Sequence, residues 1–116
     1  MDELKIYRNE LKNSKPPKYK LIGIVSEIIL STELFDKNID TKSFLMEVFN
    51  KEFNEYVYAS RTTIVSRTIR LIEDCEDKVY LEYKNNLYKF IDKEIDKRLE
   101  NSKSKIGNTF DGWIKV

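Results

Sequence analysis

The sequence predicts an all-α fold, a single-domain bundle of about five helices. The first observation is a shortage of turn formers, because the 116 residues include only 3 Gly and 2 Pro, too few for an all-β sandwich. The second is the 41 % of hydrophobic residues, which is too high for a disordered chain. The third is that apolar residues recur at helical spacing along most of the chain.

A chain of this length builds one core, so we expect a single domain over residues 1–116. It divides into an N-terminal helix with a Pro-Pro linker over 1–17, a helical core over 18–101 and a C-terminal tail over 102–116. The adjacent Pro16 and Pro17 set the first boundary, because proline lacks a backbone donor and disfavours helix in the residue before it.

The first two helices differ in how much of their surface is apolar. A narrow stripe predicts a short helix over about residues 2–13, with Asp2 as its N-cap; it comprises Leu4, Tyr7 and Leu11. The next helix is expected from Lys18 or Tyr19 to Ser31. Apolar residues crowd most of its circumference: Leu21, Ile22, Ile24, Val25, Ile28, Ile29 and Leu30. Such a helix is expected to be central and buried.

A polar loop over residues 35–40 leads into a third helix, which Asp40 or Thr41 is placed to cap. We expect this helix to span residues 42–56. A wide apolar face predicts it: Phe44, Leu45, Val48, Phe49, Phe53 and Tyr56.

Ser60 is a good N-cap for a fourth helix over residues 61–75. Successive residues placed 100° apart form one apolar arc: Leu71, Ile64, Cys75, Thr68, Ile72, Val65 and Ile69. The opposite arc holds Thr62, Thr63, Ser66, Arg67 and Arg70. Arg61 falls in the first turn, where its side chain can swing out past the end of the helix.

A long fifth helix is predicted from about residue 78 to 101, preceded by the acidic residues Glu73, Asp74, Glu76 and Asp77, which suit a helix start. Apolar residues recur at every fourth position: Val79, Tyr83, Leu87, Ile91, Ile95 and Leu99. A β-hairpin over 78–91, turning at Asn85-Asn86, is the alternative. The helix is favoured because the fourfold spacing continues past Ile91.

Composition argues against most enzyme classes. There is no His, and the single Cys75 cannot form an internal disulfide, so zinc, haem and histidine-based triads are not expected. The four clustered acids match no calcium loop, and there is no glycine-rich phosphate loop. We therefore expect no catalytic residues, no metal and no cofactor, and we read Cys75 as a buried small hydrophobe.

The location follows from what the sequence lacks. No apolar run approaches the roughly 20 residues of a membrane span, and the segment from Met1 to Glu10 lacks the apolar centre of a signal peptide. We expect a cytoplasmic protein. The abundance of Lys, Ile and Asn suggests an AT-rich bacterium or its phage.

The strongest functional signal is an acid-free segment from Tyr56 to Ile72, which holds three of the five arginines. Because the net charge is only +1, any contact with an anion must come from such a local patch. We expect Arg67 and Arg70 to face nucleic acid, Arg61 to reach a flanking phosphate, and hydroxyls to assist from Thr62, Thr63 and Ser66. The alternative is that Arg67 and Arg70 pair with carboxylates such as Glu47, Glu52 or Glu55.

The string from Ser60 to Arg67 resembles the recognition helix of helix-turn-helix repressors of the LacI type, in which Ser-x-x-Thr-Val-Ser-Arg is common. The resemblance covers about ten residues. It implies DNA binding, with the third helix as support and the fourth as reader. Glu55 and Ala59 stand where such motifs carry alanine and glycine.

Two functional hypotheses follow. The favoured one is a small non-enzymatic DNA-binding protein of transcription regulation, as a possible homodimer, assisted by a basic stretch of Lys12, Lys15, Lys18 and Lys20, and by Lys103 and Lys105 in the tail. Its rival is a protein-interaction module such as an adaptor, inhibitor or assembly subunit. That module would bind a protein partner through a Tyr-rich helix, Tyr80, Tyr83 and Tyr88, or through the aromatic tail with Trp113.

Overall fold

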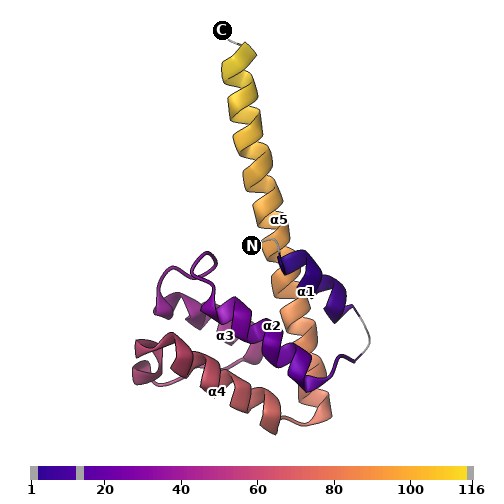
Figure 1. The fold of residues 1–116 in the computed structure, drawn as a ribbon, viewed down its shortest axis with the longest axis vertical. Coiled ribbons are helices and arrows are strands. Elements are labelled where there is room, and N and C mark those ends of the chain that lie inside the picture. Colours follow the sequence, from indigo (N-terminus) through magenta and orange to yellow (C-terminus); the bar gives the residue numbers. More distant parts are fainter. Residues whose placement is uncertain (1–2, 13–14, 115–116) are drawn as a thin grey trace.

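The described part of the chain contains five α-helices and two short 3-10 helices in a computed structural model (Figure 1). The structure describes the backbone of residues 3–12 and 15–114 and the side chains of residues 3–12 and 15–101. None of the backbone within those ranges is in a β-strand. The all-α prediction is therefore confirmed, and residues 78–91 are helical rather than a hairpin.

The α-helices are α1 (Glu3–Leu11), α2 (Lys18–Leu30), α3 (Thr41–Phe49), α4 (Arg61–Asp74) and α5 (Asp77–Ile114), and the 3-10 helices are η1 (Asn38–Asp40) and η2 (Glu55–Ala59). Three of the predicted helices, α1, α2 and α4, lie close to their expected bounds. No helix among the described residues is both long and apolar enough to cross a membrane.

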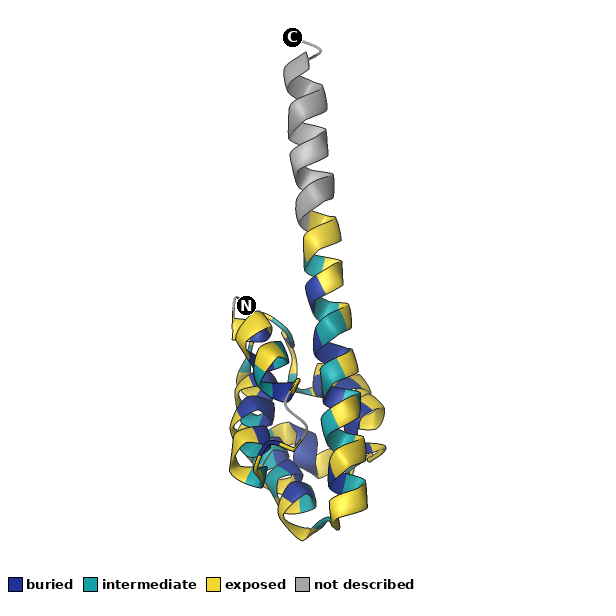
Figure 2. Ribbon diagram, turned by 90° about the vertical axis from the view of Figure 1, so that its right-hand side faces the viewer, coloured by how far each residue is buried: buried dark blue, intermediate teal, exposed yellow. Residues whose placement is uncertain are grey.

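The core lies between three packed pairs of α-helices. α2 packs on α4, while α5 packs on both α3 and α1. Figure 2 shows the buried residues on the sides of the helices that face one another. Phe44, fully buried, lies near the centre, with ring centroids 5.7 Å from Phe35, 6.2 Å from Phe49 and 4.8 Å from Phe90. Each such side chain stabilises the fold by about 1.5–3 kcal/mol through burial.

α2 contributes apolar side chains to the core along its whole length. Its predicted central position is confirmed, because five of its apolar side chains are buried: Leu21, Ile24, Val25, Ile28 and Ile29. Ile22 is half-buried, and Leu30 at its end is 48 % exposed. On α1 the predicted stripe of Leu4, Tyr7 and Leu11 is buried as well.

The predicted length of α3 is wrong, because the helix ends at Phe49 rather than near Tyr56. Asn50 adopts the left-handed conformation, φ 50° and ψ 43°, and its N–H donates to the carbonyls of Leu45 and Met46. Asn tolerates this conformation better than most residues and so terminates the helix. The chain then runs through an irregular stretch into η2.

Asp40 occupies the N-cap position of α3, but its carboxylate does not cap that helix. It accepts a hydrogen bond from the Lys37 N–H at 2.9 Å, across η1. The buried Thr41 hydroxyl donates to the Asn38 carbonyl at 2.7 Å. The loop before α3 is thus tied together locally.

α5 passes through Asn85-Asn86 without a break. The Asn86 amide donates to the Val48 carbonyl at 3.1 Å, so it satisfies one of the open carbonyls at the end of α3. Leu87, Ile91 and Ile95 are buried as their fourfold spacing predicts, whereas Leu99 is 46 % exposed.

The compact helix-turn-helix arrangement is not seen. The eleven residues from Asn50 to Ser60 separate α3 from α4, where the motif has a tight turn. α4 packs mainly on α2, with further contacts to η2, rather than on α3. The third helix is therefore not the main packing partner of α4 that the motif requires.

Candidate functional site

α4 begins at a well-formed cap. Ser60 has an extended backbone, and its hydroxyl accepts a hydrogen bond from the Thr63 N–H at 3.4 Å. The hydroxyls of Ser60 and Thr62 lie 2.9 Å apart and share a second hydrogen bond. The predicted N-cap is therefore confirmed, and it satisfies one of the open N–H groups in the first turn of α4.

The two faces of α4 are those that the sequence predicts. Ile64, Thr68 and Ile72 are buried, and the Thr68 hydroxyl donates to the Ile64 carbonyl at 2.7 Å. On the other side the proposed contact residues reach solvent: Thr62, Ser66, Arg67 and Arg70 are exposed, and Thr63 is half-buried. The structure thus brings five of the six predicted site residues together on one face.

Arg61 is the exception, because its side chain turns inward. Its Nε donates to the Asn38 amide oxygen at 2.9 Å, Nη1 to the Ile29 carbonyl at 2.7 Å and Nη2 to the Phe35 carbonyl at 2.9 Å. The expected swing past the helix end is wrong. α4 runs antiparallel to α2, so Arg61 meets the end of α2, where it binds the Ile29 carbonyl in the last turn and the Phe35 carbonyl in the loop that follows. The C-terminal end of a helix attracts a cation.

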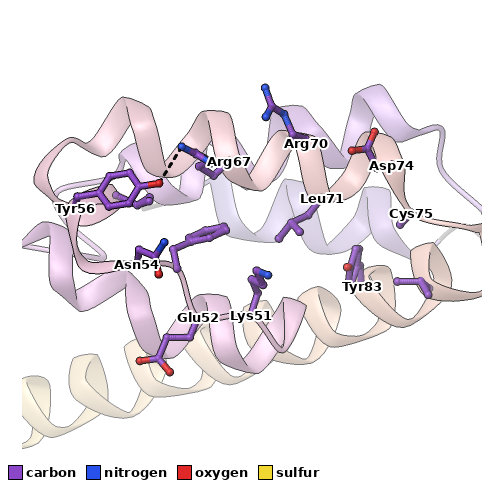
Figure 3. A pocket seen from close by; sticks show the side chains of 13 residues that line it. Lys51, Glu52, Asn54, Tyr56, Arg67, Arg70, Leu71, Asp74, Cys75 and Tyr83 are labelled. Carbon is purple, nitrogen blue, oxygen red and sulfur yellow. Dashed lines mark hydrogen bonds between the residues drawn. The ribbon is translucent and has the colours of Figure 1, made fainter.

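Arg67 and Arg70 behave differently from the other arginines. In Figure 3 the Arg67 guanidinium reaches Tyr56, with Nη2 3.4 Å from the phenol oxygen, and lies 5.9 Å from the ring centroid. Arg70 extends outward from α4 (Figure 3). Neither forms an ion pair with any carboxylate whose side chain the structure describes.

The other arginines are used within the fold. Arg8 pairs with Asp92 at 3.0 Å, and Arg98 pairs with Glu33 at 2.8 Å. Two of the carboxylates that could have paired with α4 have other partners: Glu47 contacts Lys93 and Glu52 lies 3.3 Å from Lys42. The alternative, in which Arg67 and Arg70 form ion pairs with these carboxylates, is therefore not seen among the described side chains.

A groove of about 540 Å³ lies beside this face, between the stretch after α3, η2, α4 and the start of α5. Its apolar lining includes Phe53, Val57, Leu71, Val79 and Tyr83. The polar lining consists of Lys51, Glu52, Asn54, Tyr56, Arg67, Arg70 and Asp74. Figure 3 shows that these side chains come from separate elements. Glu52 points away from the others and Asp74 lies near Arg70 (Figure 3).

The sequence does not identify Lys51, Asn54 and Tyr56 as site residues, because the predicted third helix extends over them. Tyr56 was expected on its apolar face, yet it is 63 % exposed. Asn50 was the usable signal, since Asn is common just after a helix end. Recognising that stop would have placed these residues in a connection beside α4.

The basic stretch around the prolines is largely engaged with the protein. Lys18 donates to the carbonyls of Glu73 at 3.1 Å and Cys75 at 2.9 Å, at the C-terminal end of α4. Two other lysines form ion pairs: Lys15 Nζ lies 3.3 Å from Asp77 Oδ2, and Lys20 Nζ lies 3.8 Å from Glu10 Oε1. Lys18 thus binds the end of a helix, and Lys15 and Lys20 form surface ion pairs. The three lysines do not extend into solvent as a free arm.

The tyrosines of α5 pack inward. Tyr80 is 2 % exposed and its hydroxyl donates to the Pro16 carbonyl. The Tyr83 ring meets Phe49 edge-on with centroids 4.8 Å apart, and Tyr88 is half-buried against the core. A partner surface built from this Tyr-rich helix therefore has little exposed area to offer. Lys103, Lys105 and Trp113 lie outside the described side chains.

The acidic cluster is divided between two helix ends. α4 ends at Asp74, while Asp77 stands in the first turn of α5, where a carboxylate complements the helix dipole. Among the described side chains no three Cys, Asp or Glu residues gather closely enough to hold a metal ion.

Cys75 follows α4 directly, half-buried, with its Sγ donating to the Ile72 carbonyl at 3.1 Å. Burial raises the pKa of the Cys75 thiol above its ordinary value, and nearby Lys18 offsets this only in part. Because the thiolate is the reactive form, we expect Cys75 to react several-fold more slowly with a disulfide reagent at pH 8 in the native protein than in urea. Equal rates, followed by absorbance, would contradict this.

The string that resembles a LacI-type recognition helix occupies the start of α4. Ser60 caps it, Ile64 is buried, and Ser66 and Arg67 are exposed. The two departures from the motif, Glu55 and Ala59, are the first and last residues of η2. Comparison of the whole chain with models of known protein families, with curated proteins and with solved structures finds no match.

Proposed function

We propose that this is a small non-enzymatic regulatory protein that binds DNA through the exposed face of α4. One observation carries the proposal. Arg67 and Arg70 are exposed on one helix face, and neither forms an ion pair with a described carboxylate, although Arg67 also donates to the Tyr56 hydroxyl. Arg8 and Arg98 pair with carboxylates, and Arg61 donates to backbone carbonyls. An exposed arginine fork without a carboxylate partner matches the geometry of a phosphate.

The roles on this face differ by residue. Arg67 and Arg70 bind phosphates, and the exposed hydroxyls of Thr62 and Ser66 add hydrogen bonds to phosphate oxygens. Thr63 is half-buried and its N–H is held by Ser60, so it contributes mainly to the cap. Arg61 positions the start of α4 and does not itself reach a phosphate. A homodimer would present two such faces to one nucleic acid.

A protein-interaction module is the second candidate. The observation that favours it is the apolar lining of the groove beside α4, which would suit an acidic peptide with a large apolar side chain. In this case the partner binds the groove rather than the Tyr-rich helix, whose Tyr80 is buried. The two candidates differ in how strongly binding depends on salt.

Salt dependence tests the proposal directly. We expect labelled DNA to bind with a log K that falls linearly with log salt, with a slope of about −1.4 to −2.7 for two or three phosphate contacts. Fluorescence anisotropy between 50 and 200 mM salt measures this slope, with polyglutamate as an acidic control. An affinity for DNA that does not change with salt concentration, or an equal affinity for polyglutamate, would count against a DNA-binding protein.

A further inference from the structure

We infer that the groove beside α4 receives an unstacked base, so that the nucleic acid bound is single-stranded. The inference rests on the proposed function and adds the class of ligand. Its starting point is Tyr56, a large aromatic side chain that is 63 % exposed at the rim of the groove. Exposed aromatic rings beside arginines are typical of surfaces on which bases stack.

Tyr56 is held in place rather than left loose. Arg67 contacts both its hydroxyl, at 3.4 Å, and its ring, at 5.9 Å from the centroid. η2, which carries Tyr56, is anchored by the buried Val57 and Tyr58, the two residues that follow Tyr56. The Tyr58 hydroxyl in turn accepts a hydrogen bond from the Phe53 N–H at 3.3 Å. A ring fixed in this way loses little freedom when a base stacks on it.

The groove has the size and lining that a base requires. Its volume of about 540 Å³ falls within the roughly 300–1,000 Å³ of sites for small organic groups. Phe53, Leu71 and Tyr83 provide apolar surface, and Asn54 places an amide at the rim for hydrogen bonds to a base edge. A base in a duplex is stacked and paired, so it would have to leave the helix to enter.

Charge around the groove fits a strand that follows its rim. Lys51, Arg67 and Arg70 contribute three positive charges. Two carboxylates line the groove as well, Glu52, which is paired with Lys42, and Asp74. The phosphates therefore lie toward Arg67 and Arg70, while the base lies on Tyr56. Stacking of this kind is tolerant of sequence, because every base has a flat face.

The test compares Tyr56→Leu with Tyr56→Phe, using a labelled 12-nucleotide oligothymidylate and a 12-base-pair duplex at the same salt concentration. We expect the single strand to bind at least tenfold more tightly. Tyr56→Leu should weaken its binding by about 5- to 150-fold, the range for loss of one base–aromatic stack. Tyr56→Phe keeps the ring and should stay within about threefold of the natural protein.

Tyr19→Leu is the matched control, because Tyr19 is 73 % exposed on α2 and does not line the groove. If the duplex binds as well as the single strand, or Tyr56→Leu costs no more than Tyr19→Leu, the inference is overturned while the proposed function stands. If neither nucleic acid binds, both are overturned. Thermal unfolding of each variant verifies that the changes leave the fold intact.

Discussion

The double variant Arg67→Ala/Arg70→Ala is expected to lose at least about 100-fold in affinity for nucleic acid. Each charge-assisted hydrogen bond to phosphate contributes about 1.5–3 kcal/mol, and every tenfold change in affinity corresponds to about 1.4 kcal/mol. The slope of log K against log salt should also become less negative by about 1.4–1.8, as two phosphate contacts are lost. Fluorescence anisotropy over a salt series measures both quantities.

The fold should survive this change. Both side chains are exposed, and neither has a described carboxylate partner whose charge would be left alone. Surface substitutions of this kind alter the free energy of unfolding by roughly 0.5 kcal/mol or less. Lys5→Ala/Lys89→Ala removes the same charge from exposed positions on α1 and α5. An equal loss of affinity in that control would show that overall charge, not the face of α4, governs binding.

The faces of α4 could be predicted because they depend on local rules. Ser60 marks the start of the helix, and a 100° step per residue then separates Ile64, Thr68 and Ile72 from Ser66 and Arg70. No knowledge of the neighbouring helices is needed to find the exposed side. α5 is similar, since its fourfold spacing continues far beyond the length of a hairpin strand.

The groove could not be predicted, because it depends on where one helix stops and another packs. Asn50 ends α3 early, so Phe53 packs from an irregular segment although its spacing suits a continued helix. Tyr56 then comes to lie against Arg67 from a different element. The spacing of residues along the sequence does not predict a contact between two separate elements such as this one.

The roles of the individual lysines and arginines also depend on how the helices pack, so the sequence did not predict them. A positive side chain is drawn to carbonyls at helix ends as readily as to phosphates. Lys18 finds the end of α4 and Arg61 finds the end of α2, since these two helices pack antiparallel. The charge pattern identified cations, but only the packing separates those used for folding from those left for binding.

Arg61→Ala is expected to lower the free energy of unfolding by about 2–4 kcal/mol. The guanidinium joins α4 to the carbonyls of Ile29 and Phe35 and to the Asn38 side chain, so its loss leaves partly buried acceptors without donors. Arg61→Lys should recover only part of this, because one ammonium group cannot reproduce a planar fork with three bonds. Urea unfolding, monitored by circular dichroism, measures the difference.

Arg67→Ala is the matched control for that measurement, since Arg67 lies on the same helix and its side chain is exposed. It should change stability by roughly 0.5 kcal/mol or less while weakening nucleic-acid binding. Arg61→Lys, which keeps the charge, should bind nucleic acid almost normally under conditions where it is folded. The reverse pattern, with Arg61→Ala stable but deficient in binding, would mean that Arg61 leaves the end of α2 to contact phosphate, as the sequence first suggested. The two variants thus distinguish Arg61, which holds α4 in position, from Arg67, which contacts the nucleic acid.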